Sequence, residues 1–212
     1  MEQSTSEKWQ AAWRSKKFRN KIFIGLILLF LTLATFPFFF QTIDERNGPV
    51  INDWLLNYLP AYNVSVAIFI IMWSATAFIF IRVFQNPDIF VVYLWAYIML
   101  SISRLLVISA VPLNPPVGLL ELKDPISNTF YGMRVVTKDL FFSGHTSTLF
   151  LDFLCLVKMK DKIIMLAATI TVACLLLIQH VHYTIDVLAA PVFTYLIYSF
   201  AKKNFQNKIS NK

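Results

Sequence analysis

KIFIGLILLFLTLATFPFFF, residues 21–40, is the stretch that decides the class of fold. After Lys21 it carries no charge, and it is long enough to cross a hydrocarbon core of about 30 Å as a helix. Basic residues precede it, as in a signal peptide. Its apolar core is too long for one, however, and it ends in FPFFFQT instead of a small-residue cleavage site. We therefore expect a retained membrane span.

Five further apolar runs follow the first. The chain of 212 residues is 57% hydrophobic and 15% charged, which is too apolar for an ordinary soluble domain. We expect an all-α, polytopic membrane protein with six transmembrane helices. The predicted spans are about 21–40, 64–84, 88–112, 140–158, 162–179 and 184–201. The predicted organisation is an N-terminal basic interfacial segment (1–20), the six-span membrane domain (21–201) and a basic tail (202–212).

The net charge of +7 becomes informative when it is mapped onto these spans. Six spans put both termini on one side, and that side collects most of the lysines and arginines. This excess predicts cytoplasmic termini and a multi-pass protein of the cell membrane. The basic runs are orientation signals and contacts to membrane lipids, so no nucleic-acid partner is expected. The oligomeric state is left open.

Three ionisable side chains interrupt the apolar C-terminal part: His180, His182 and Asp186, in HVHYTIDVLAA (180–190). Such groups are costly inside a membrane and are functional by default. His182 and Asp186 are four apart, so on a helix they share a face, whereas His180 points elsewhere. An aspartate that orients one ring nitrogen makes the other a better base or nucleophile. A purely structural pair at a helix end is the alternative.

A second polar cluster, FFSGHTSTLF, holds Ser143, Gly144 and His145 near the start of the fourth predicted span. Even-numbered spans begin on the outer face, so both clusters are expected at the same, non-cytoplasmic membrane surface. Backbone N–H groups at a helix start favour an anion such as phosphate, and Ser143 can donate a further hydrogen bond. An N-cap serine with an interfacial histidine is the alternative.

Together the two clusters predict phosphoryl transfer through a histidine. His182 would attack phosphorus, and Asp186 would stabilise its imidazolium form. His145 would protonate the departing oxygen, a contribution of roughly 10²–10⁴-fold in rate. No metal or cofactor is needed. HxH followed by a helical i+4 aspartate is an uncommon zinc arrangement, and no neighbouring carboxylate or cysteine completes it.

SGHT followed by HYTIDV resembles the phosphatidic acid phosphatase type 2 (PAP2) superfamily, and within it the sphingomyelin synthase branch. KDLFFSGHTSTLFL is similar to that branch's third motif and HVHYTIDVLAA to its fourth; SRLLVISAVP is loosely similar to its second. The resemblance implies a six-span fold with an outward-facing site and a triad of His145, His182 and Asp186. It also matches Asp139 to the aspartate of the third motif, and His180 to a histidine outside the triad.

The chain departs from the ordinary phosphatases of this superfamily. It contains no Arg-Pro pair, and Leu175 and Leu176 stand where those members carry Ser-Arg. Both departures favour the sphingomyelin synthase branch, but a phosphate still needs cations. The candidates are Arg104, Lys138, Arg134 and Lys123. Arg104 is the best of them, because it is costly in the outer part of a span unless it meets an anion or an acid. Snorkelling toward the surface is its other interpretation.

The leading prediction is an integral membrane lipid phosphotransferase. It would move a phospho-headgroup from a glycerophospholipid to a lipid alcohol, such as ceramide or diacylglycerol, through a phosphohistidine. One alternative is a lipid phosphate phosphatase that resolves the same intermediate with water; the other is a catalytically silent membrane carrier or scaffold. The expected substrate-binding residues are Ser143, Gly144, Asp139, Arg104 and Lys138. Asp152, two turns deeper than His145 on the same face, has no assigned role.

Overall fold

A computed structural model describes residues 4–123 and 136–206. Within these ranges helices are the only regular secondary structure, which confirms the predicted all-α class for this part of the chain. The ends of the predicted N-terminal segment and tail, 1–3 and 207–212, lie outside the described residues. The helices are α1 (Thr5–Arg14), α2 (Lys16–Glu45), α3 (Trp54–Tyr58), α4 (Ser65–Phe84), α5 (Pro87–Ala110), α7 (Gly144–Cys155), α8 (Met159–Ile178) and α9 (Thr184–Phe205).

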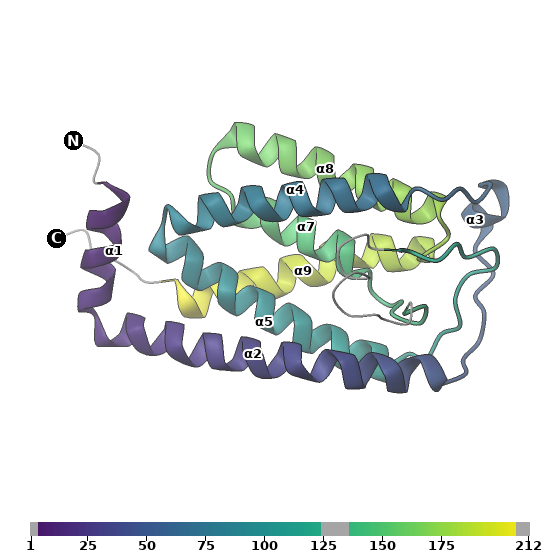
Figure 1. The fold of residues 1–212 in the computed structure, drawn as a ribbon, viewed down its shortest axis with the longest axis horizontal. Helices are drawn as coiled ribbons and strands as arrows, with labels where there is room; N and C mark the ends of the chain where they lie inside the picture. Colours follow the sequence, from purple (N-terminus) through teal and green to yellow (C-terminus); the bar gives the residue numbers. More distant parts are fainter. Residues whose placement is uncertain (1–3, 124–135, 207–212) are drawn as a thin grey trace.

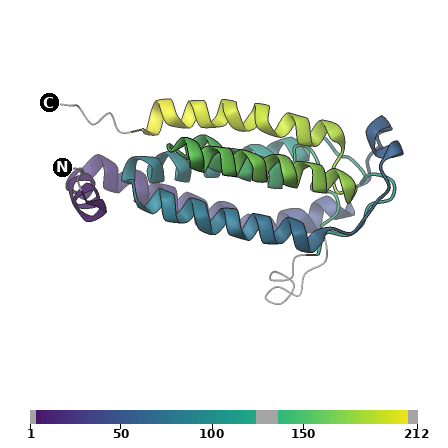
Figure 2. The same ribbon diagram turned by 90° about the horizontal axis from the view of Figure 1, so that it is seen from above.

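The long helices run along one common axis, and the short α7 lies among them (Figure 1). α7 packs against α4, α5, α8 and α9, whereas α2 lies on the outside of α5. The view from above shows the same elongated bundle, with α1 turned away from its axis at one end (Figure 2). The start of α1 and the end of α9 lie at this end of the bundle (Figure 1). We call it the basal end. The loop with α3 and the start of α9 lie at the opposite end.

Five of the described helices are long and apolar enough to cross a membrane: α2, α4, α5, α8 and α9. They coincide with five of the six predicted spans. The fourth predicted span, 140–158, is helical only over the 12 residues of α7. At 1.5 Å per residue such a helix is about 18 Å long, shorter than the roughly 30 Å of a hydrocarbon core. Its predicted boundaries were therefore wrong at both ends, and six full spans remain a prediction.

The division between core and outer surface explains how so short a helix fits. Outward side chains on the long helices are large and apolar, as with Phe30 (71% exposed) and Ile70 (62% exposed). Such faces require lipid or a partner. Inside the bundle, Ile79, Leu149 and Val172 are completely buried. Because four helices surround α7, its backbone ends are sheltered from lipid by protein, which is where non-helical backbone is tolerated in a membrane.

Candidate active site

Ser143 sets the first residue of α7. Its hydroxyl accepts hydrogen bonds from the backbone N–H of Thr146 (3.4 Å) and from the Thr146 hydroxyl (3.1 Å), and the serine is completely buried. A side-chain oxygen in this position satisfies N–H groups that the helix cannot. This contact starts the helix at Gly144 and explains why the predicted start at residue 140 was too early.

The first turn of α9 is held by two carboxylates. The backbone N–H of Tyr183 donates to Asp186 Oδ2 at 3.0 Å. Thr184 donates from its backbone N–H (2.6 Å) and its hydroxyl (2.9 Å) to Asp53, which also caps α3. The sequence interpretation missed Asp53. Its available signal was a short acidic side chain directly before the apolar residues Trp54-Leu55-Leu56, a typical N-cap pattern.

The two polar clusters meet through their backbones. The N–H of Ser143 donates to the carbonyl oxygen of Asp186 at 3.1 Å. One hydrogen bond therefore joins the start of α7 to the first turn of α9. The residues predicted from two separate motifs are brought to one place in the bundle, at the end opposite the start of α1 (Figure 1).

His182 and Asp186 form the predicted pair, although His182 precedes the first residue of α9. The ring Nδ1 lies 3.5 Å from Asp186 Oδ2, and both side chains are buried, at 2% and 0% exposed. This distance is longer than an ordinary hydrogen bond of about 2.7–3.2 Å. Asp186 thus faces Nδ1, one of the two nitrogens of the ring.

His145 lies on the first turn of α7 and is half-buried. Its ring meets the ring of Phe69 from α4 edge-on, with centroids 6.2 Å apart. The aromatic contact closes one side of the histidine, while its partial exposure leaves a path to the surface. This arrangement suits a group that exchanges protons with a bound molecule.

Arg104 reaches the start of α7 from α5. Its Nε donates to the carbonyl of Phe142 at 3.2 Å, and its Nη2 forms an ion pair with Asp139. The side chain is only 13% exposed, so the interpretation that Arg104 snorkels to the surface was wrong. A methyl group on Gly144 would overlap the guanidinium. The glycine is needed for this close approach, because any side chain there would displace the arginine.

Asp139 lies within electrostatic range of both histidines. Burial raises the pKa of its carboxyl. The adjacent Arg104 and the charges of His182 and His145 lower this pKa by more than burial raises it, so it lies below its ordinary value. The acid predicted from the third motif is thus grouped with the two histidines and the arginine. It is one-quarter exposed, so this edge of the site is open to solvent.

The other predicted cations lie elsewhere. The ammonium group of Lys138 donates to the backbone carbonyl of Arg46, at the end of α2. Lys123 is 61% exposed and pairs with Glu121 at 3.5 Å. Neither of these contacts involves the two histidines. Arg134 lies outside the described residues.

His180 has a structural position, distinct from that of His182. Its Nδ1 and Nε2 each lie 2.9 Å from a backbone carbonyl, those of Val117 and Leu59. It therefore joins two loops to the turn between α8 and α9. Its φ of 55° is in the left-handed region, which is uncommon outside glycine and persists only where surrounding contacts enforce it. Gly118, with φ +80°, approaches the ring closely.

Asp152 lies in the middle of the bundle and is completely buried. Neither carboxyl oxygen makes a hydrogen bond of ordinary geometry within residues 4–123 and 136–206, although the hydroxyl of Tyr93 lies beside it. Arg104, which could have been its partner, forms its ion pair with Asp139. Nothing in the structure explains this carboxyl. Within the same residues no cluster of three or more metal-ligating side chains forms.

One family model matches the chain. The PAP2 superfamily C-terminal domain matches residues 138–203, a region that contains both histidine clusters. No curated protein matches the sequence significantly. This similarity covers less than half of the chain, and together with the apolar helices it suggests a membrane lipid phosphatase-like protein.

Proposed function

We propose that the protein is an integral membrane lipid phosphotransferase of the sphingomyelin synthase-like branch. It would move a phospho-headgroup from a glycerophospholipid to a lipid alcohol such as ceramide or diacylglycerol. The hydrogen bond from Ser143 to Asp186 carries this proposal. It joins the start of α7, where backbone N–H groups favour a phosphate, to the pair of His182 and Asp186. The excess of lysine and arginine near the basal end supports a site on the non-cytoplasmic face of the cell membrane.

In the first step, His182 Nε2 attacks the phosphorus of the donor. A P–N bond forms, and the bond from phosphorus to the diacylglycerol oxygen breaks. His145 gives its proton to that oxygen, so that neutral diacylglycerol leaves. Asp186 faces Nδ1 at 3.5 Å and balances the positive charge that the ring acquires.

In the second step, His145 takes the proton of the acceptor hydroxyl. The acceptor oxygen attacks phosphorus, the P–N bond breaks, and His182 is regenerated. Arg104 is the cation proposed for the phosphoryl oxygens: its Nε and Nη2 are held by Phe142 and Asp139, while Nη1 lies over Gly144 at the helix start. A guanidinium fixed in this way can offer the N–H groups of Nη1 to phosphate oxygens at the helix start.

Hydrolysis by the same residues is the second candidate. The partial exposure of His145 and the 25% exposure of Asp139 favour it, because water can reach this edge of the site. The intermediate would be the same, and only the molecule that attacks it would differ. A silent carrier or scaffold is favoured by no observation on the site.

The test uses purified protein in detergent–lipid micelles, with headgroup-labelled phosphatidylcholine, phosphatidylethanolamine or phosphatidic acid. Each donor is supplied with and without ceramide, or a diacylglycerol whose acyl chains differ in length from those of the donor, so that the product can be separated from the donor. The expected result is a new labelled phospholipid that forms only with an acceptor and is lost in His182→Ala. Free phosphate or phospho-headgroup formed without an acceptor would establish the hydrolase instead. Movement of intact lipid between vesicles, with no product from any donor, would establish the carrier.

A quenched-flow trap tests the intermediate. Donor labelled with ³²P should transfer label to the protein through an acid-labile P–N bond. His180→Gln is the matched control, because it changes a buried histidine of the same segment that makes only structural contacts. Label should persist in this control and vanish in His182→Ala; label that persists in both would place the intermediate on another residue.

A further inference from the structure

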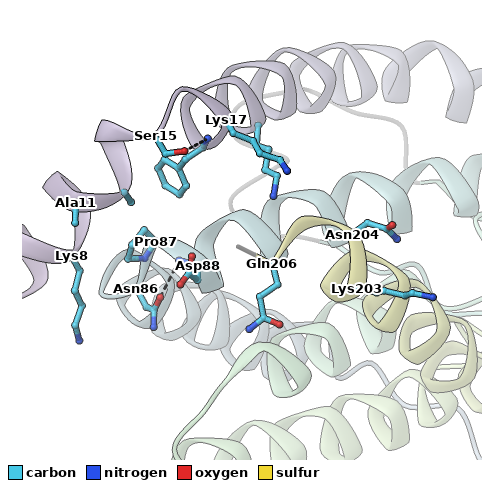
Figure 3. A pocket seen from close by; sticks show the side chains of 13 residues that line it. Lys8, Ala11, Ser15, Lys17, Asn86, Pro87, Asp88, Lys203, Asn204 and Gln206 are labelled. Atoms are coloured by element: carbon cyan, nitrogen blue, oxygen red, sulfur yellow. Dashed lines mark hydrogen bonds between the residues drawn. The ribbon is translucent and has the colours of Figure 1, made fainter. Parts of the chain in front are cut away.

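A hollow of about 770 Å³ opens at the basal end, far from the histidines (Figure 3). Lysines from three helices line it: Lys8 on α1, Lys17 and Lys21 on α2, and Lys203 on α9. Against these four lysines the lining contains one carboxylate, Asp88. The starts of α2 and α5 and the ends of α1 and α9 all border the hollow, so the partial charges of the helix ends offset one another and the lysines set its sign. The hollow therefore favours an anion.

The walls of this hollow are held in place by specific contacts. The indole N–H of Trp9 on α1 donates to the carbonyl of Phe84 at 2.7 Å, and its ring packs edge-on against Phe18 and Phe90. Lys21 Nζ donates to the carbonyl of Phe205 at 2.8 Å, which ties α2 to the end of α9. These contacts hold together the four helices that border the hollow, α1, α2, α5 and α9.

A second hollow, of about 600 Å³, adjoins the first and shares Lys17 and Lys21 with it. Its apolar lining consists of Ile24, Trp95 and Phe205. The rings of Trp95 and Phe205 stack with centroids 4.0 Å apart, and the Trp95 indole donates to the Lys21 carbonyl at 3.2 Å. Ile24 lies one turn further along α2 than the lysines. The apolar hollow therefore extends from the lysines along the lipid-facing side of the bundle.

A lysine-lined hollow joined to an apolar one has the two-part chemistry of a lipid with a negatively charged headgroup. We propose that the paired hollows bind one anionic glycerophospholipid. Its phosphate lies at Lys17 and Lys21, which line both hollows, and one acyl chain lies against Trp95 and Phe205. Lys8 and Lys203 lie at opposite sides of the first hollow and add to its positive charge (Figure 3). A free phosphate would use only the first hollow and would leave the apolar one unexplained. The site lies at the membrane surface opposite the catalytic histidines and is separate from the transfer chemistry.

The test measures thermal unfolding of the full chain in a zwitterionic detergent, with added phosphatidylglycerol, phosphatidylcholine or inorganic phosphate. Phosphatidylglycerol should raise Tm by about 5 °C at a hundredfold excess over its Kd. The double variant Lys17→Glu/Lys203→Glu should weaken this binding by roughly tenfold or more, because each lysine near an anionic lipid is worth about 1 kcal/mol, or about fivefold. Both lysines are exposed, so the lipid-free Tm should stay near that of wild type.

The matched control is Lys158→Glu/Lys160→Glu. It reverses the same number of exposed charges on the neighbouring α7–α8 turn and α8, outside the two hollows, and should keep the wild-type response. Equal loss in both double variants would overturn the proposal in favour of diffuse attraction. An equal Tm rise with phosphatidylcholine would overturn it as a general lipid effect. An equal rise with inorganic phosphate would show that the acyl chain contributes nothing, and would overturn the lipid as occupant.

Discussion

The backbone N–H of Ser143 donates a 3.1 Å hydrogen bond to the carbonyl of Asp186, and this bond joins two helix starts that are distant in the sequence. Because both groups belong to the backbone, the link does not depend on either side chain. The hydroxyl of Ser143 contacts Thr146. The carboxylate of Asp186 contacts Tyr183 and His182. The positions of the two proposed catalytic histidines therefore depend on how α7 and α9 pack.

The first prediction concerns His145 as the general acid. In His145→Gln, transfer from a natural donor should fall roughly 10²–10⁴-fold, because the diacylglycerol oxygen leaves poorly without a proton. A p-nitrophenyl phosphodiester donor should lose far less, since nitrophenolate leaves without protonation. Steady-state rates with the two donors provide the measurement. Equal losses with both donors would show that His145 does not protonate the leaving group.

The second prediction concerns the close approach of Gly144 and Arg104. In Gly144→Ala the new methyl group displaces the guanidinium, so we expect kcat/KM to fall at least tenfold. The loss corresponds to a charged hydrogen bond of about 1.5–3 kcal/mol. Arg104→Lys should show a similar loss, because an ammonium cannot reproduce the guanidinium fork. Thr148→Ala, on the next turn of α7, is the control; if it lost as much activity, the effect would be on the helix and not on the arginine.

The third prediction separates His180 from His182. His180→Ala leaves at least one of the carbonyls of Val117 and Leu59 without the ring N–H that faces it, and such a loss costs about 1–3 kcal/mol. We expect a lower free energy of unfolding, while the folded fraction still forms the phosphorylated protein. Denaturation curves and phosphoprotein yield per folded molecule provide the two readouts. A variant of full stability with no phosphoprotein would assign His180 to the chemistry instead.

The fourth prediction concerns the pH dependence of stability through Asp53. Burial raises the pKa of Asp53. Hydrogen bonds from Thr184, Leu56 and Leu55 lower this pKa by more than burial raises it, so the folded pKa lies below its ordinary value. A depressed carboxyl pKa adds stability above the unfolded pKa of about 3.9, and this stability is lost as pH falls through the folded pKa. Asp53→Asn should therefore lower Tm by a constant amount above about pH 5, and the difference from wild type should shrink below about pH 4.

The control for Asp53 is Glu45→Gln, which changes an exposed carboxylate at the end of α2. Its Tm should follow the wild type throughout the pH range. Calorimetry at several pH values measures all three proteins. A difference between Asp53→Asn and wild type that grows in acid would contradict the assigned role, because the sign of the linkage would then be reversed.

Apolar runs predicted most of the fold. Residues 21–40 and four other runs coincide with long helices, because a stretch that long and apolar has few alternatives to a membrane helix. The fourth predicted span, 140–158, was longer than α7, because the length of an apolar run does not reveal that Ser143 caps the helix and starts it at Gly144. Of the site residues, His182 and Asp186 make the predicted contact. Arg104 pairs with Asp139, in line with the expectation that an arginine is costly in a membrane span unless it meets an anion or an acid.

Neither the position of Lys138 nor the contact of Asp53 with α9 could be assigned from local sequence. Lys138 turned out to bind the Arg46 carbonyl, and Asp53 to hold the start of α9, because their partners lie in other loops. The sequence by itself determined the helical membrane class and the residues capable of histidine chemistry, since hydropathy and side-chain type are local properties. Only the tertiary structure decided that the ring of His180 joins two loops, because the carbonyl groups of Val117 and Leu59 that it meets come from parts of the chain distant in the sequence.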